Sequence, residues 1–254
     1  MSKNNWDIHI SEYAVYLRIE RALSQNTIIS YTSDLYKLAN FLGDELTPSQ
    51  VKLSDVTQFI EGLVKVGISK RSQSRIISAL KSFFAYLEIE GEISSSPCEK
   101  LSTPKIGKYI PEVLSLEEVT AIIESVDLSR AEGHRNRAIL ELLYSCGLRV
   151  SELTELRISD LFMEEEFLRV VGKGNKQRIV PMGDYAKKAV NLYLSQNRCC
   201  KKGYEDVLFL NRRGTPLSRV MVFNIVKSQA LVAGVTKNIS PHTYRHTFAT
   251  HLLE

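Results

Sequence analysis

The sequence lacks any long apolar segment. None of its hydrophobic runs approaches the roughly 20 residues that a membrane-spanning helix requires. No apolar stretch follows Lys3 near the N-terminus, so a secretory signal peptide is not indicated either. We therefore expect a cytoplasmic protein that does not bind a membrane.

Cysteine is also scarce, and its four residues form no recognisable framework. Cys98 and Cys146 are isolated, whereas Cys199 and Cys200 are adjacent. A secreted disulfide-rich domain would have spread, paired cysteines, and a zinc site would typically show C-x-x-C pairs. We expect reduced, structural cysteines that bind no metal.

Nothing in the composition indicates disorder or low complexity, and the sequence contains no internal repeat. Hydrophobic residues make up 44% of the chain and charged residues 24%, which is typical of a globular protein. At 254 residues the chain is long for one compact core and comfortable for two domains of ordinary size. We therefore expect a domain boundary.

Acidic residues are missing from two long stretches, although the net charge is only +4. Residues 62–87 contain five basic residues and no acid, and residues 207–253 contain six basic residues and no acid. Residues 112–166, by contrast, hold 13 of the 29 acids. Segregated charge of this kind is expected where some faces meet phosphates, and the alternative for each stretch is an ordinary solvated helix face.

The first hundred residues show helical periodicity. Four apolar stripes follow one another, and each predicts an amphipathic helix. They comprise Tyr13, Tyr16 and Leu17; Ile28, Tyr31, Leu35, Leu38 and Leu42; Val56, Phe59, Ile60 and Leu63; and Ile76, Ile77, Leu80, Phe83, Phe84 and Leu87. Helix-capping residues precede the last three, at Ser24, at Ser54 with Asp55, and at Ser69. The pattern predicts a four-helix domain.

Proline, glycine and serine interrupt the helical pattern between residues 94 and 111. We place the boundary here, with a helical domain over residues 1–103, a linker over residues 104–110 and a second domain over residues 111–254. The linker is basic and extended, which suits a segment that crosses a DNA backbone. A plain interdomain tether is the alternative.

The second domain mixes helical and strand patterns. Ser115 and Glu118 form a capping box for a helix that ends near Val126, and residues 136–155 form a longer helical region interrupted at Gly147. Residues 167–171 and 177–181 are β-prone runs joined by a Gly-Lys-Gly-Asn-Lys turn, which indicates a hairpin. Further helices are expected over residues 184–196, 218–233 and 240–253. The expected fold is mainly α, with an α+β second domain that contains a small antiparallel sheet.

Two motifs of the second domain carry cations at a helix end and at a hairpin tip. In Gly-Leu-Arg-Val-Ser-Glu-Leu, a spacing of three places Glu152 on the same helical face as Arg149, where its carboxylate can hold the guanidinium. In Gly-Lys-Gly, the glycines let the backbone approach a duplex, so that Lys173 can act as an acid. Each alone has an ordinary explanation, a surface ion pair for the first and a simple turn for the second.

A third motif starts at Ser240 and Pro241, which indicate the beginning of a helix. His242 and Arg245 are three residues apart and share a face of its first turn, where the helix N-terminus also favours an anion. Two arginines, a histidine and a lysine gathered together would have no evident structural purpose.

The three motifs together resemble the tyrosine recombinase (phage integrase) family. Gly-Leu-Arg-x-Ser-Glu-Leu, Gly-Lys-Gly-x-Lys-x-Arg and Pro-His-x-x-Arg-His-Thr-Phe-Ala-Thr-His-Leu occur in this order, and their wording is most similar to the bacterial Xer recombinases that resolve chromosome dimers. The first hundred residues, with Ser24, Thr27, Tyr31 and Asp34 before a Ser-rich basic fourth helix, resemble that family's SAM-like core-binding domain. The resemblance implies site-specific recombination by DNA strand cleavage and rejoining through a 3′-phosphotyrosyl intermediate.

The resemblance also implies roles for particular residues. Arg149 and Arg245 match the two arginines that grip the scissile phosphate, and Glu152 would orient Arg149. Lys173 matches the hairpin lysine that protonates the leaving 5′-hydroxyl, and His242 matches the histidine in acid–base support. Clustered, preorganised donors can stabilise a phosphoryl-transfer transition state, so we expect no metal or other cofactor.

The acid-free stretches and the hairpin supply a second set of residues, which we predict to contact DNA phosphates. These residues are Lys70, Arg71, Arg75, Lys81, Lys176 and Arg178. The expected partners are double-stranded DNA with inverted half-sites, a second copy or a sibling recombinase in a tetrameric synapse, and a DNA translocase. The expected processes are DNA recombination and integration, chromosome partition and cell division.

The sequence departs from the family pattern after its last motif. The family continues into a Leu-Gly-His motif and then the nucleophilic tyrosine, whereas this sequence stops at Glu254. We expect the nucleophile to lie beyond Glu254, and the 254-residue chain to bind DNA without cutting it. Tyr244 is a poor substitute, because it points off the face that His242 and Arg245 share.

Several alternatives stay open at this point. A catalytically silent DNA-binding module would use the same cations for affinity alone, and a phage- or transposon-type integrase would use the same chemistry. His242 and His246 have the spacing of zinc ligands, but the glutamate that should follow the first histidine is missing. A type IB topoisomerase would grip the phosphate similarly, but the helical N-terminal domain favours recombination. The target site, the choice of homo- or heterotetramer, and the choice among dimer resolution, integration and inversion are not specified.

Overall fold

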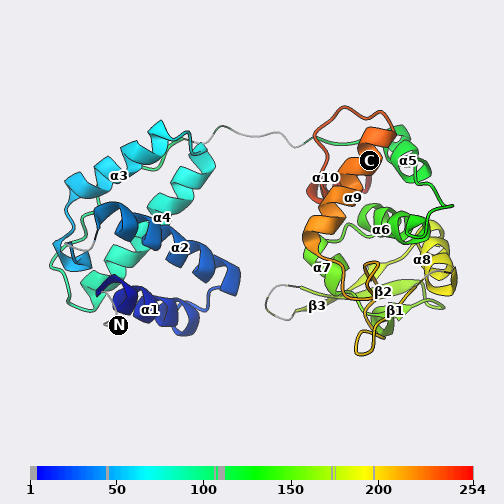
Figure 1. The fold of residues 1–254 in the computed structure, drawn as a ribbon, viewed down its shortest axis with the longest axis horizontal. Coiled ribbons are helices and arrows are strands. Elements are labelled where there is room, and N and C mark those ends of the chain that lie inside the picture. Colours follow the sequence, from blue (N-terminus) through cyan, green and yellow to red (C-terminus); the bar gives the residue numbers. More distant parts are fainter. Residues whose placement is uncertain are drawn as a thin grey trace. The chain divides into compact units, whose positions relative to one another are not determined.

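The computed structural model describes residues 5–43, 46–105, 107, 112–172, 174, 176–196 and 198–253. The chain divides into two compact units, Met1–Lys108 and Tyr109–Glu254, which we call the N-terminal and C-terminal units. Each has its own hydrophobic core and is described by itself (Figure 1). Within the described ranges, neither unit has a helix with the length and hydropathy needed to cross a membrane.

The N-terminal unit is helical, as predicted. It consists of α1 (Asn5–Ile19), α2 (Gln25–Leu42), α3 (Leu53–Lys65) and α4 (Lys70–Ile89), with a 3-10 turn at Pro48–Gln50. Its core is rich in aromatic rings. The Phe83 ring stacks on Trp6 with 6.0 Å between ring centroids and meets Tyr13 edge-on at 5.3 Å. These buried pairs join α1 to α4 and stabilise the bundle beyond the burial of apolar area alone.

The predicted capping residues are confirmed at two of these helices and wrong in detail at the third. The Ser24 and Ser69 hydroxyls accept hydrogen bonds from the backbone N–H groups of Thr27 and Ser72 at the starts of α2 and α4. At α3 the hydroxyl of Ser54 does not cap the helix. Instead the Asp55 carboxylate accepts the backbone N–H of Lys52, since the helix begins at Leu53, before Ser54.

The C-terminal unit combines helices with a small sheet, which confirms the predicted fold class. Its helices are α5 (Leu116–Glu124), α6 (Gly133–Ser145), α7 (Val150–Glu155), α8 (Asp184–Gln196), α9 (Arg219–Val232) and α10 (Pro241–His251). Residues 138–143 of α6 are buried on every side, and α6 packs against α5, α8, α9 and α10. A helix that is buried all round occupies the centre of a core. The predicted break at Gly147 is present, but α6 begins at Gly133, three residues before the predicted start.

The sheet presents one face to this core. Strands β1 (Leu161–Phe162), β2 (Phe167–Val171) and β3 (Gln177–Pro181) are antiparallel in the order β1-β2-β3. The predicted bounds of β2 and β3 are confirmed, whereas β1 was not predicted because two residues are too few to show a period. Leu168, Val170 and Val180 are buried. Because Arg178 pairs with Val170 and lies two residues before Val180, it also occupies the inward face.

Candidate active site

Arg149 and Glu152 are fixed to one another at the start of α7. Glu152 Oε2 accepts the backbone N–H of Arg149 at 2.8 Å, and Glu152 Oε1 accepts Nη1 of the Arg149 guanidinium at 2.8 Å. The contact expected from the spacing of three residues is therefore present. The Glu152 side chain is 3% exposed, whereas the Arg149 side chain is 51% exposed. A buried carboxylate thus holds one edge of a guanidinium whose other edge reaches the surface.

Arg245 reaches the same carboxylate from α10. Its Nη1 donates to the carbonyl oxygen of Gly147 at 2.5 Å and lies 4.0 Å from Glu152 Oε2. Gly147 makes this possible, because its φ of +54° turns the chain sharply between α6 and α7. Arg149 and Arg245 are 96 residues apart in the sequence and converge on one acid. Two half-exposed guanidiniums side by side form a site that an anion such as a phosphate can complete.

Arg178 occupies the rest of the Glu152 carboxylate. Its Nη1 donates to Oε1 and its Nη2 to Oε2, both at 2.8 Å, in a bidentate pair. We predict that Arg178 contacts a DNA phosphate, and in the structure its side chain pairs with Glu152 and is 37% exposed. A sequence signal for this contact exists. An arginine on the inward face of a strand needs a buried acid, and β3 places Arg178 on the same face as Val180.

Glu152, Arg149, Arg178 and Arg245 together form a group that we call the Glu152 cluster. Its electrostatics follow from these contacts. Burial raises the pKa of Glu152, but hydrogen bonds from Arg178 and from the backbone and side chain of Arg149 outweigh burial and lower the pKa to about 2. The pKa of Arg245 is lowered, first by burial and then by the positive charge of Arg149. Glu152 is therefore charged at neutral pH, and the arginines around it repel one another in the absence of an anion.

Two further predicted residues are His242 and Lys173. His242 is exposed in the first turn of α10, three residues before Arg245. Lys173 lies outside the described residues, but its neighbour Gly172 is described. A Cβ atom placed on Gly172 would lie 3.6 Å from Arg178 Nη1 and 3.8 Å from Glu152 Oε1. The hairpin therefore starts beside the Glu152 cluster.

Tyr244 and the histidines of α10 differ in exposure and in contacts. Tyr244 is fully buried, and burial raises the pKa of its hydroxyl. Within the described ranges, no group of three histidine, cysteine or acidic side chains is placed to hold a metal ion, so His242 and His246 find no third ligand there. His251 instead pairs through Nδ1 with the Tyr144 hydroxyl at 3.0 Å.

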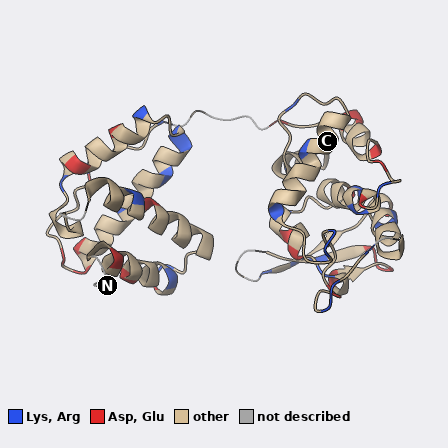
Figure 2. Cartoon of the chain, in the orientation of Figure 1, with Lys and Arg blue, Asp and Glu red and all other residues tan. Residues whose placement is uncertain are grey.

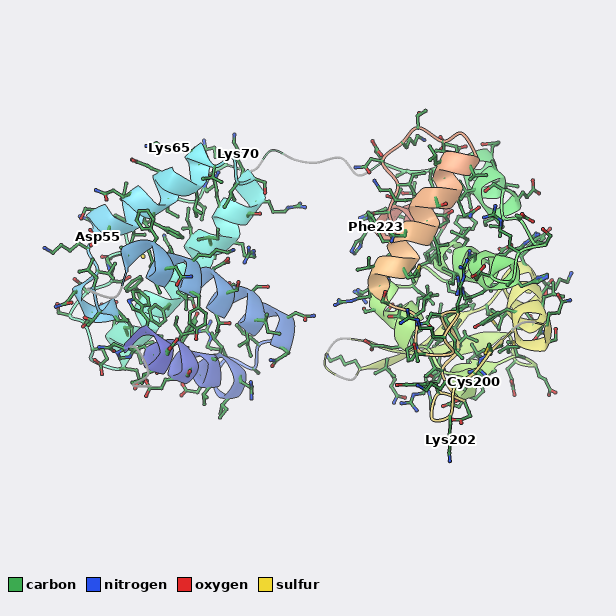
Figure 3. The ribbon with its side chains drawn as sticks, viewed as in Figure 1. Asp55, Lys65, Lys70, Cys200, Lys202 and Phe223 are labelled. Carbon is green, nitrogen blue, oxygen red and sulfur yellow. The ribbon has the colours of Figure 1, made fainter. Side chains whose placement is uncertain are left out.

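The predicted DNA-contacting residues of the N-terminal unit differ in their surroundings. Lys70 and Arg71 are exposed at the start of α4, where blue segments mark the helix end in Figure 2, and Lys65 at the end of α3 lies close by (Figure 3). Lys81 is half-buried, with Nζ 3.5 Å from the carbonyl oxygen of Glu99. Lys176, in the C-terminal unit, is exposed just before β3.

Arg75 has an internal partner. Its guanidinium pairs with the carboxylate of Asp34, which is fully buried in α2 and also accepts Lys37 Nζ at 2.8 Å. A buried carboxylate without a partner is strongly destabilising. Arg75 therefore links α2 to α4, and its replacement would test the stability of the N-terminal unit as well as DNA binding.

Family models match both units of the chain. Residues 112–254 match the model of the phage integrase family, and residues 10–91 match the model of the phage integrase N-terminal SAM-like domain. The chain is 40% identical to the tyrosine recombinase XerD of Staphylococcus saprophyticus over 254 residues, covering 98% of this chain and 85% of that protein. It is also 40% identical to the tyrosine recombinase XerD of Chlorobaculum tepidum, covering 98% and 84%.

Solved structures are similar in fold. The crystal structure of XerA recombinase is 31% identical, with a TM-score of 0.52, and the match covers 98% of this chain and 84% of that one. A lambda integrase tetramer bound to a Holliday junction is 20% identical, with a TM-score of 0.74, and the match covers 98% and 74%. The second similarity concerns the fold alone.

Proposed function

Because the chain belongs to the phage integrase family and is a DNA breaking and rejoining tyrosine recombinase, we propose that its Glu152 cluster is the phosphate site of a site-specific recombination reaction. In this reaction a tyrosine attacks the scissile phosphate, a 3′-phosphotyrosyl bond forms, and the 5′-oxygen leaves. Another 5′-hydroxyl later attacks the phosphotyrosyl bond and releases the tyrosine. A phosphodiester is thereby formed again, and the reaction requires no external source of energy.

The convergence of Arg149 and Arg245 on Glu152 carries this proposal. The transition state of phosphoryl transfer places negative charge on the non-bridging oxygens, and fixed guanidiniums stabilise that charge without reorganisation. Glu152 orients Arg149 and limits the mutual repulsion of the two arginines.

Lys173 and His242 supply the proton transfers in this proposal. The 5′-oxygen leaves as a hydroxyl only if an acid protonates it, and the ammonium of a lysine that follows Gly172 in the sequence suits that task. His242 shares the exposed face of α10 with Arg245, so its imidazole can exchange a proton with the attacking or leaving oxygen.

Covalent trapping tests the proposal. The protein, as its gene encodes it, is incubated with a suicide duplex that loses its 5′-hydroxyl strand after cleavage. We expect a protein joined to the 3′-phosphate of the DNA, formed equally well in the presence of a metal chelator. A 5′-linked adduct, or a metal requirement, would contradict the mechanism. Site-specific binding without any adduct would favour the catalytically silent module.

Tyr244→Phe serves as an internal control for the nucleophile. Because the Tyr244 hydroxyl is buried and has no hydrogen-bond partner in the described structure, its removal should leave the yield of adduct unchanged within about twofold. Loss of the adduct in a folded Tyr244→Phe variant would make Tyr244 the nucleophile and overturn this assignment.

The exposed cations at the start of α4 give a prediction for DNA binding. Each phosphate that a lysine or arginine neutralises contributes a slope of about −0.9 to log K against log salt. The double variant Lys70→Gln, Arg71→Gln should therefore reduce the magnitude of the slope by about 1.8. Arg75 is left in place because it pairs with Asp34.

The matched control removes one exposed arginine of α1 and one that follows the end of this helix, with Arg18→Gln and Arg21→Gln. This variant loses the same net charge from a segment whose neighbouring residues include acids. We expect it to leave the slope nearly unchanged. If both double variants flattened the salt dependence equally, the start of α4 would not be a phosphate-binding surface, and the effect would be one of net charge.

We further propose that the chromosomal role is dimer resolution. The similarity to XerD proteins supports this role, and a lambda integrase tetramer on a Holliday junction supports a tetrameric synapse built from this chain or a sibling. In that role a DNA translocase would bring two sites together in the cytoplasm. A plasmid dimer with two directly repeated sites should be resolved to monomers in cells that have the gene and should persist in cells that lack it. Equal resolution in both would contradict the role.

A further inference from the structure

The Glu152 carboxylate has no unused hydrogen-bonding position in the described structure. A carboxylate offers about four lone-pair positions. Oε1 accepts Nη1 of Arg149 and Nη1 of Arg178, and Oε2 accepts the backbone N–H of Arg149 and Nη2 of Arg178, all at 2.8 Å. Arg178 alone fills two of these four positions.

Arg245 stands next to this filled carboxylate without bonding to it. The distance from Arg245 Nη1 to Glu152 Oε2 is 4.0 Å, and the same nitrogen donates to the Gly147 carbonyl instead. A guanidinium this close to a buried carboxylate with two vacant positions would form a hydrogen-bonded pair with it, since charge-assisted bonds are the strongest available. Such a pair would turn Arg245 from the surface toward the interior.

We propose that Arg178 is a positioning residue, which saturates Glu152 and thereby keeps the guanidinium of Arg245 available to the scissile phosphate. The inference rests on the function proposed above. It also gives the hairpin a task besides carrying Lys173. Arg178 belongs to β3, and Gly172 at the start of the turn lies against both Arg178 and Glu152. The strand pairing that positions Arg178 therefore also positions the residue before Lys173.

The variant Arg178→Gln tests the proposal in single-turnover DNA cleavage by the protein as its gene encodes it. We expect the cleavage rate to fall about 10- to 100-fold, because a small displacement of one catalytic donor has effects of this size. DNA affinity and the slope of log K against log salt should stay unchanged, since Arg178 contacts no phosphate in this account. A slope smaller by about 0.9 would make Arg178 a phosphate contact and overturn the proposal.

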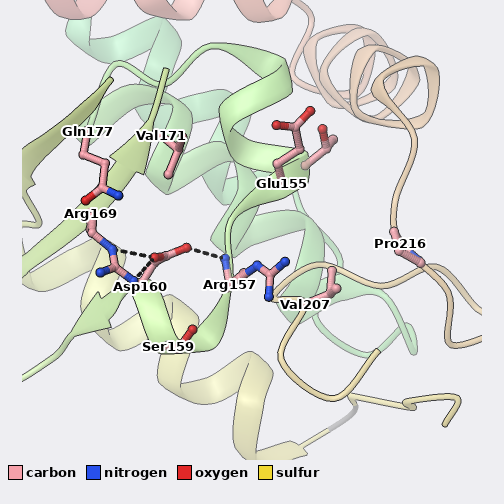
Figure 4. A pocket seen from close by; sticks show the side chains of 10 residues that line it. Glu155, Arg157, Ser159, Asp160, Arg169, Val171, Gln177, Val207 and Pro216 are labelled. Carbon is pink, nitrogen blue, oxygen red and sulfur yellow. Dashed lines mark hydrogen bonds and ion pairs between the residues drawn. The ribbon is translucent and has the colours of Figure 1, made fainter. Parts of the chain in front are cut away.

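Arg169→Gln is the matched control on the neighbouring strand. Arg169 donates through Nε to Oδ1 of Asp160 at 2.9 Å, and its Nη2 lies 2.8 Å from the same oxygen in an ion pair (Figure 4). The Asp160 side chain is 8% exposed, so this variant also removes the arginine partner of a buried acid beside the same sheet. We expect a comparable loss of thermal stability and a cleavage rate within about twofold of the unmodified protein. Equal slowing by both variants would reduce Arg178 to a merely structural role.

A readout that needs no catalysis separates this proposal from the proposed function. In the 254-residue chain, the pKa of the Glu152 carboxyl can be followed by carbon NMR during acid titration. It should lie near 2, rise clearly in Arg178→Gln, and stay in place in Arg169→Gln. An unchanged pKa in Arg178→Gln would overturn the saturation of Glu152. If the protein as its gene encodes it cleaved no DNA but these pKa shifts appeared in the 254-residue chain, the proposed function would fail and the contact of Arg178 with Glu152 would stand.

Discussion

Replacement of Arg245 with lysine is expected to lower the rate of DNA cleavage about 10²- to 10³-fold, the typical cost of losing one preorganised donor to a transition-state oxyanion. The guanidinium uses Nη1 to bind the carbonyl oxygen of Gly147. Its other nitrogens lie on the same planar fork and can donate to a phosphate at the same time. A lysine ammonium is a single point of charge on a flexible stem and cannot do both. The measurement is single-turnover cleavage at saturating protein.

Arg137→Lys controls for the chemistry of the substitution. Arg137 lies on α6, its side chain is 34% exposed like that of Arg245, and its Nε is 4.0 Å from the carboxylate of Glu141. The control should therefore cleave DNA at the normal rate. Because Arg245→Lys keeps its charge, its DNA affinity should stay within a few-fold of normal. Cleavage by Arg245→Lys within threefold of the unmodified rate would remove Arg245 from the phosphate site.

Most of the fold could be predicted because its elements have clear periods. The bounds of α8, β2 and β3 agree with the predicted ranges residue for residue. These segments alternate or repeat over several turns, so local pattern and tertiary burial agree. The two-residue strand β1 exists because β2 offers an edge in the folded unit, and no local pattern announces it.

The local contacts of the site could be predicted from residue spacing, whereas the contacts between distant elements could not. The pairing of Arg149 with Glu152 follows from helix geometry, since residues three apart share a face. The approach of Arg245 depends on how α10 packs on α6, and the resemblance to a family, not the spacing of residues, indicated it. Basic residues were predicted to bind phosphates from their charge alone, without regard to the direction in which each side chain points.

The side chains of two of these arginines pair with an internal acid. Arg75 meets Asp34 across the contact of α2 with α4, and Arg178 meets Glu152 from the inward face of β3. In each case the buried acid lies on another element, so the pair forms only when tertiary structure does. An arginine at an otherwise inward position therefore indicates an internal acid before it indicates a ligand.

The largest effect on stability is expected for Gly147→Ala, about 2–4 kcal/mol in the free energy of unfolding of the C-terminal unit. Gly147 has a φ of +54°, which is costly for any residue with a Cβ atom. That Cβ atom would also overlap the ring of Phe248, which lies on α10 three residues after Arg245. Relief of the overlap requires movement of α10 or of the turn before Arg149, so cleavage should fall together with stability.

Gly234→Ala separates the two causes. Gly234 has a φ of +73°, and a Cβ atom there would meet nothing within 4 Å, so its replacement should cost only about 1 kcal/mol of backbone strain. Trp6 is the single tryptophan and lies in the N-terminal core, so its fluorescence follows that unit, and circular dichroism follows both. We expect Gly147→Ala to lower the unfolding transition of the C-terminal unit seen by circular dichroism and to leave the transition seen by Trp6 fluorescence unchanged. The substitution should also cost less in a Phe248→Ala background, where the overlap is gone. Equal costs for Gly147→Ala and Gly234→Ala would show that strain alone, and not contact with α10, requires glycine at this turn.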